Sequence, residues 1–128
     1  QSFINRLRET QVFKIDFTSD LEGRLERNVE VTLYRIVTEM INNTFKYASA
    51  SRVSIELKYS AADTKVTLEY SDDGKGFDVE KAILKGRGLG ISNIHQRVRA
   101  MNGYTVLRST PGKGVYLLVE LDSILINT

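Results

Sequence analysis

Three side chains of complementary chemistry, Glu39, Asn43 and Lys46, follow one another at helical spacing. At about 100° per residue they fall within about 60° of one another, so a helix presents them in one line. A carboxylate and an amide oxygen suit a hard divalent cation that keeps most of its water, as Mg²⁺ does, and a nearby lysine suits phosphate. An ordinary solvated helix face is the alternative. The Asn42-Asn43 pair argues against it, because asparagine amides compete for backbone partners within a helix.

A second chemical segment is Ser71-Asp-Asp-Gly-Lys-Gly-Phe-Asp78, directly after a predicted strand. The carboxylate of Asp72, at the strand end, can accept a hydrogen bond from an exocyclic amine. Gly74 and Gly76 allow backbone to approach a flat ligand closely, because glycine has no side chain. An acidic glycine turn is the alternative, and this segment alone does not decide between the two.

Glycines also gather at Gly86-Arg-Gly-Leu-Gly-Ile91, ahead of a predicted helix. Free N–H groups and the helix dipole make such a position an anion site. It differs from the dinucleotide-binding fingerprint, because Ile91 stands where the pattern continues and no strand directly precedes it. No Gly-Lys pair precedes Ser or Thr, which excludes a phosphate-binding P-loop. A fourth segment, Pro111-Gly-Lys-Gly-Val115, is typical of a hairpin turn.

These segments lie between elements that the hydrophobic pattern predicts. Strands are expected at Val12–Phe17, Arg52–Tyr59, Val66–Tyr70, Tyr104–Ser109 and Val115–Leu121, and helices at Asn28–Ala48 and Ile91–Met101. Shorter features are a helix at Phe3–Glu9, a connection at Thr18–Arg27 and a helical turn at Val79–Leu84. Their order predicts an α+β fold, a two-layer sandwich with helices on one face of a mixed, mostly antiparallel sheet.

The composition narrows the function further. A chain of 128 residues, 41% hydrophobic, is the size of one domain, and we expect residues 1–128 to form it. With 18 basic and 16 acidic residues, all scattered, the net charge of +2 gives little support for nucleic-acid binding. There is no cysteine and one histidine, His95, which excludes thiol chemistry and histidine-cluster metal sites. No apolar run approaches the roughly 20 residues of a membrane span.

Because the chain begins at Gln1, we expect it to be part of a longer protein, with residues 1–11 the end of an upstream helix or linker.

Taken together, the order and spacing of the chemical segments resemble the ATP-binding domain of bacterial sensor histidine kinases, in the gyrase, chaperone, histidine-kinase and mismatch-repair (GHKL) ATPase superfamily. Leu33–Ala48 is similar to the N box of the nitrate-sensor type of histidine kinase, and residues 50–53 continue the likeness. Asp72–Asp78 resembles the first glycine box and Gly86–Val98 the second. The resemblance covers Val12 to Leu121.

The resemblance implies a role for each site residue on the predicted helix. Asn43 would bind Mg²⁺ through its amide oxygen. Glu39 would be the catalytic carboxylate, holding or polarising a water of the metal shell. Lys46 would contact the phosphates of ATP, and Tyr47 would line the site.

On the opposite side of the site, Asp72 would accept from the adenine amino group, and Gly74 and Gly76 would admit the base. The stretch Phe77–Lys85 would be a short lid over ATP. The remaining ATP-binding residues would form its hinge and a phosphate-facing turn: Gly86, Gly88, Leu89 and Gly90.

Three departures from the family pattern accompany this resemblance. Val115 stands where the family usually has a threonine that supports the adenine-binding aspartate. Asp122–Thr128 replaces a proline expected after the last strand. The phosphorylated histidine of the family lies on a hairpin outside this chain, and His95 is expected to have a structural role.

The implied function is to bind Mg-ATP and supply its γ-phosphoryl group to a histidine on a separate dimerisation domain of the same or a sister chain. A response regulator receiver domain would then take the phosphoryl group. The domain would be cytoplasmic and would itself contact neither nucleic acid nor membrane; the resemblance leaves a membrane anchor in the parent protein open. The isolated chain would not phosphorylate itself. A degenerate nucleotide-binding module, or another GHKL ATPase or serine kinase, is the alternative.

Overall fold

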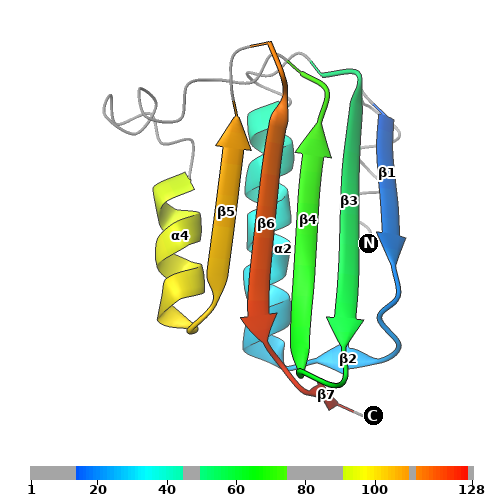
Figure 1. The fold of residues 1–128 in the computed structure, drawn as a ribbon, viewed down its shortest axis with the longest axis vertical. Helices are drawn as coiled ribbons and strands as arrows, with labels where there is room; N and C mark the ends of the chain where they lie inside the picture. Colours follow the sequence, from blue (N-terminus) through cyan, green and yellow to red (C-terminus); the bar gives the residue numbers. More distant parts are fainter. Residues whose placement is uncertain (1–13, 45–49, 75–90, 110–111, 127–128) are drawn as a thin grey trace.

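The computed structural model describes residues 14–44, 50–74, 91–109 and 112–126. They form two layers, a five-stranded sheet and two helices packed against one of its faces (Figure 1). The predicted α+β sandwich is therefore confirmed. The helix predicted at Phe3–Glu9 and the helical turn predicted at Val79–Leu84 lie outside the described residues.

The sheet has the strand order β1-β3-β4-β6-β5. Its strands are β1 (Lys14–Ser19), β3 (Arg52–Ser60), β4 (Lys65–Asp72), β5 (Tyr104–Ser109) and β6 (Val115–Asp122). β1 and β3 are parallel, and the other neighbours are antiparallel, so the sheet is mixed as predicted. Parallel neighbours need a long crossover, which here contains the helix α2 (Arg27–Asn43).

The core lies between the helices and the inner face of the sheet. Alternate strand residues turn toward α2 and α4 (Ile91–Ala100), as the period of two requires. The fully buried strand and helix side chains include Ile36, Ile41, Val53, Ile55, Val66, Leu68, Tyr70, Val98, Leu117 and Leu121. The outer face carries the polar half of each alternation, which explains why the hairpins were recognisable from sequence.

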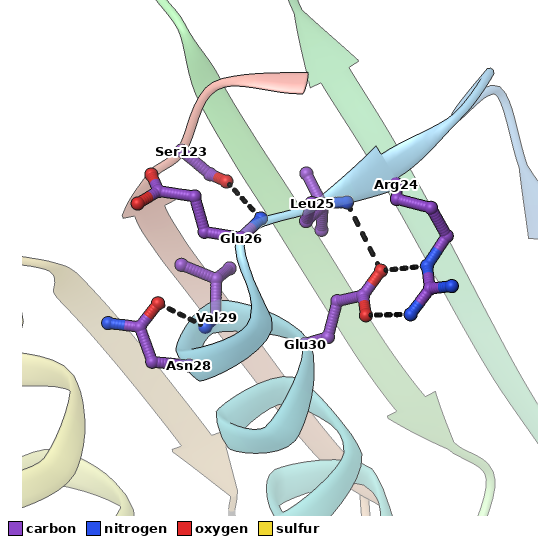
Figure 2. A network of polar contacts seen from close by, with 7 residues as sticks. All are labelled: Arg24, Leu25, Glu26, Asn28, Val29, Glu30 and Ser123. Atoms are coloured by element: carbon purple, nitrogen blue, oxygen red, sulfur yellow. Dashed lines mark hydrogen bonds and ion pairs between the residues drawn. The ribbon is translucent and has the colours of Figure 1, made fainter. Parts of the chain in front are cut away.

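A second, two-stranded sheet corrects the connection predicted at Thr18–Arg27. β2 (Arg24–Leu25) pairs antiparallel with β7 (Leu125–Ile126), joining the C-terminal segment to the start of α2 (Figure 2). Glu30 accepts from Arg24 Nε and Nη2 at 2.8 and 2.6 Å and from the Leu25 N–H at 3.1 Å. Two-residue strands have too little alternation for a pattern to predict them.

The end of α4 is a Schellman motif, in agreement with a helix predicted to end at Met101. Asn102 takes the left-handed conformation, φ 58°, and its N–H donates to the Arg99 carbonyl at 3.0 Å. The Gly103 N–H donates to the Val98 carbonyl at 2.8 Å. A Cβ atom on Gly103 would lie 2.5 Å from Leu121 Cδ2 and 2.6 Å from the Glu120 carbonyl oxygen. Glycine at 103 therefore allows α4 to pack closely on β6.

We predict that Gly103→Ala lowers the free energy of unfolding by about 1–3 kcal/mol, because the added atom overpacks this contact. Asn102→Gly is the matched control. Glycine suits a left-handed position, so this variant should stay within about 0.5 kcal/mol of the wild type or exceed it. Urea denaturation followed by circular dichroism measures both. Equal losses in the two variants would contradict the packing argument.

Candidate functional site

The end of α2 and the end of β4 meet at Asp72. Thr44, which follows α2 in helical conformation, donates from Oγ1 to Asp72 Oδ2 at 3.1 Å. The N–H of Gly74 donates to Asp72 Oδ1 at 2.9 Å. The N–H of Val115, the residue paired with Asp72 across the sheet, also donates to this carboxylate. A half-buried carboxylate thus receives hydrogen bonds from three parts of the fold.

Opposing effects act on the pKa of Asp72. Burial raises it, because the charged form loses water, and the neighbouring charge of Asp73 raises it further. The hydrogen bonds from Gly74, Thr44 and Val115 lower it, because they favour the ionised form. Burial is the larger effect, so the pKa of Asp72 is raised overall. Raised carboxyl pKa values of this origin are typical of binding and catalytic sites.

Gly114 holds the backbone of Asp72 from the neighbouring strand. It has φ 75°, and a Cβ atom there would lie 2.1 Å from the Asp72 carbonyl oxygen. Any other residue at 114 would displace the end of β4. The pairing of β5 with β6 confirms the hairpin predicted around Pro111–Val115. Gly114 in this hairpin also allows the close approach to the Asp72 backbone.

Asp73, one residue further, has a different environment. Its carboxylate accepts from the N–H groups of Ser51 and Arg52 at 2.8 and 2.9 Å and from the Ser51 hydroxyl. These bonds lower the pKa of Asp73 to about 2. Asp73 therefore ties the end of β4 to the start of β3. The two adjacent aspartates therefore differ in environment: Asp73 has a structural role, and Asp72 is the candidate site residue.

Glu39 and Asn43 lie one turn apart on α2, as the sequence predicts. Asn43 is buried, and Glu39 is half-buried. Glu39 lines a hollow of about 220 Å³ between α2 and α4, together with Tyr34, Arg35, Thr38, Asn42 and Arg97. Arg97 from α4 thus brings positive charge to the same hollow that Glu39 lines.

The Glu39 carboxylate and the Asn43 amide oxygen fit magnesium only as an ion that takes most of its ligands from elsewhere. Among the described residues, no group of three or more His, Cys, Asp or Glu side chains is placed to hold a metal. A carboxylate and an amide oxygen on one helix suit an ion that takes most of its ligands from water and phosphate. The residues present therefore fit a metal that arrives with a phosphate ligand.

The structure describes four of the predicted site residues, on α2 and at the end of β4: Glu39, Asn43, Asp72 and Gly74. Asp72 and Gly74 are hydrogen-bonded to each other, and Thr44, the residue after Asn43, is bonded to Asp72. Glu39 lines a hollow to which the other three do not contribute. The other predicted residues lie outside the described part of the chain: Lys46, Tyr47, Gly76, Gly86, Gly88, Leu89 and Gly90. The predicted lid at Phe77–Lys85 and the predicted end of the helix at Ala48 lie outside it as well.

Sequence reasoning missed the part that Thr44 and Tyr70 play at the site. Thr44 lies at helical spacing from Met40 and Ile41, and Tyr70 follows the alternation of Val66 and Leu68; all of them are buried. Their hydroxyls contact each other, and Tyr70 also lies 3.2 Å from the Met40 carbonyl oxygen. A signal did exist, because a buried hydroxyl needs a partner. The pattern could not say which partner.

His95 lies on α4 and contacts β5. Its Nδ1 pairs with the Thr105 hydroxyl, and burial lowers its pKa. In this packed position the imidazole is mainly neutral near pH 7.

No helix among the described residues is both long enough and apolar enough to span a membrane.

The fold is that of the ATP-binding domains of histidine kinases. The histidine kinase domain of the Erythrobacter litoralis blue-light activated histidine kinase superposes with a TM-score of 0.70 at 19% identity, over 94% of this chain and 59% of that chain. Full-length ShkA, solved in complex with AMPPNP, superposes with a TM-score of 0.71 at 16% identity, over 99% of this chain and 30% of that chain.

The chain belongs to the family of histidine kinase-, DNA gyrase B- and HSP90-like ATPases, whose model matches residues 28–124. It is 34% identical over 105 residues to the sensor histidine kinase ComP of Bacillus subtilis, covering 82% of this chain and 13% of ComP. It is 30% identical over 122 residues to the histidine-protein kinase/phosphatase DegS of Brevibacillus brevis, covering 94% of this chain and 31% of DegS. The chain therefore spans less than a third of either relative. The nitrate-sensor subtype stays a prediction.

The lowered pKa of Asp73 predicts the direction in which the stability of the fold changes with pH. The folded value, about 2, lies below the unfolded value of about 3.9. Asp73 thus stabilises the fold fully above pH 4 and loses this effect as the pH falls through 2. Asp73→Asn should be less stable than wild type at pH 6, and the difference should shrink toward pH 2. Urea unfolding across this range measures it, with the exposed turn residue Asp63→Asn as control. A pH-independent difference would contradict the assignment.

Proposed function

We propose that this chain binds Mg-ATP and is the catalytic domain of a two-component sensor histidine kinase. The observation that carries the proposal is the Asp72 carboxylate, which is half-buried beside Thr44 and fixed by donors from three parts of the fold. Membership of the ATPase family supports it, as do the names of ComP and DegS and the nucleotide analogue in the ShkA structure.

In this proposal the base and the phosphates bind to different elements. Asp72 accepts from the adenine amino group beside Gly74 and Gly76. Asn43 offers its amide oxygen to Mg²⁺, and Glu39 orients a water of the metal shell. Lys46 contacts the phosphates and Tyr47 lines the site; both follow α2 in the sequence. Further contacts to the phosphates come from the second glycine segment, through Gly86, Gly88, Leu89 and Gly90.

The chain's contribution to phosphoryl transfer is positioning. Bound Mg²⁺ supplies charge neutralisation on the phosphates. Residues of α2 hold the γ-phosphate so that a histidine from a separate dimerisation domain can attack in line. The phosphoryl group then passes to a receiver domain of a response regulator. We place these events in the cytoplasm, where ATP and the receiver domain are found.

Two substitutions separate the adenine and the metal contacts. Asp72→Asn should weaken adenosine and ADP alike, because it removes an acceptor and strands the ligand's donor, at a cost of about 1–3 kcal/mol. Asn43→Ala should spare adenosine and weaken only the Mg²⁺-dependent part of ADP binding. Isothermal titration calorimetry with and without EDTA measures both effects.

Asp73→Asn is the matched control for Asp72→Asn. It changes the neighbouring carboxylate, which faces Ser51 and Arg52, and should leave nucleotide affinity nearly unchanged. Equal losses of both ligands in Asp72→Asn and Asn43→Ala, with both proteins folded, would refute the division of roles. Absence of ADP binding by the wild type would refute the proposed function.

The isolated chain should remain unlabelled by γ-labelled ATP. His95 is packed against Thr105 within the same domain, and a nucleophile must approach the γ-phosphorus in line from outside. Addition of a separate dimerising hairpin that carries its histidine should allow slow transfer, since tethering is lost. His95→Gln should change neither result. Acid-labile label that disappears with His95→Gln would contradict this assignment.

A further inference from the structure

Two buried hydroxyls connect the helix to the site carboxylate. Thr44 Oγ1 lies 3.1 Å from Asp72 Oδ2 and 3.0 Å from the Met40 carbonyl oxygen, and it contacts the Tyr70 hydroxyl. Thr44 is 3% exposed and Tyr70 is 1% exposed, so water cannot replace these partners. Each hydroxyl has one proton to donate. The arrangement of these two protons therefore determines what Asp72 receives.

The surrounding contacts select one arrangement. The Met40 carbonyl oxygen has two lone pairs. One accepts from the backbone N–H of Thr44, and the Tyr70 hydroxyl, 3.2 Å away, donates to the other. The Thr44 hydroxyl donates to Asp72 Oδ2, and a bond to an ionised carboxylate is the stronger use of its proton. Tyr70 therefore leaves the Thr44 proton for Asp72.

We propose that Thr44 is a positioning residue that keeps Asp72 a pure hydrogen-bond acceptor, and thereby makes the site select a purine with an amino group over one with a carbonyl group at the same edge. This inference rests on the proposed function and adds to it the residue that sets base selectivity.

The groups around Asp72 support the selection. A carboxylate has about four lone-pair positions and accepts only from donors. Thr44 Oγ1 and the N–H groups of Gly74 and Val115 donate to it, and the Tyr70 hydroxyl lies nearby. An exocyclic amine is a donor of the same kind, so the carboxylate can accept from it. A carbonyl oxygen placed there would face another acceptor, as a hypoxanthine base does, and would be rejected.

The Thr44 hydroxyl has no substitute on the neighbouring strand. Val115 lies directly opposite Asp72 on the same face of the sheet, is 5% exposed, and brings only its N–H to the carboxylate. Directly opposite residues have Cβ atoms about 4.5–5.5 Å apart. A threonine at 115, nearly the same shape as valine, can therefore bring a hydroxyl to Asp72 from the other side.

The experiment compares ADP with IDP by calorimetry in EDTA, so that no metal contributes. Thr44→Val, which keeps the shape and removes the hydroxyl, should weaken ADP about five- to thirty-fold. It should affect IDP much less, because a carboxyl without this donor takes up a proton more readily and can then donate to a carbonyl. Discrimination between ADP and IDP should therefore fall. Thr44→Ser should keep ADP affinity within about twofold of the wild type.

Adding Val115→Thr to Thr44→Val should restore both ADP affinity and discrimination. A merely structural role for Thr44 would change the melting temperature without changing the ADP-to-IDP ratio. If Thr44→Val does not fold, Thr44→Ala gives the same comparison without added bulk. Wild-type ADP binding with an unchanged ratio in the hydroxyl-free variant overturns this inference alone. Failure of the wild type to bind ADP overturns the proposed function together with it.

Discussion

The site depends on one constraint, the burial of a carboxylate at the end of β4. Burial raises the pKa of Asp72, and the fold limits this cost with donors from α2, from the Gly74 turn and from β6. These donors come from distant parts of the sequence. The carboxylate can receive all of them only if the helix end, the turn and the start of β6 converge at one corner of the molecule (Figure 1).

The sheet produces this convergence through the central position of β4. Its neighbours β3 and β6 each fix one feature of its end: Ser51 and Arg52 hold the Asp73 carboxylate, and Gly114 allows β6 to approach the Asp72 backbone. Successive side chains of a strand point to opposite faces. Adjacent aspartates therefore enter different environments, and one stabilises the frame in which the other is buried.

Much of the fold was predictable from segments in which hydrophobic residues recur at regular spacing. Alternation located the sheet strands, and the helical stripe located α2 and the line of Glu39 and Asn43. The sequence could not distinguish the roles of Asp72 and Asp73, because that difference arises from which strand neighbours each. The burial of Thr44 follows from its helical spacing to the buried residues of α2. Its bond to Asp72 spans 28 residues and depends on how the helix is set on the sheet. The strands β2 and β7 have two residues each, which is too short for a sequence pattern to predict them.

A carboxylate whose pKa is raised by burial makes the unliganded fold less stable. Because the folded protein binds the Asp72 proton more tightly than the unfolded chain, stability falls as the pH rises through the interval between the two pKa values. An apolar residue would avoid this cost. Sites that violate a local rule of stability in this way are commonly those that a ligand completes. Here an amine that donates to Asp72 would favour the ionised carboxylate, so binding itself would offset the cost that burial imposes.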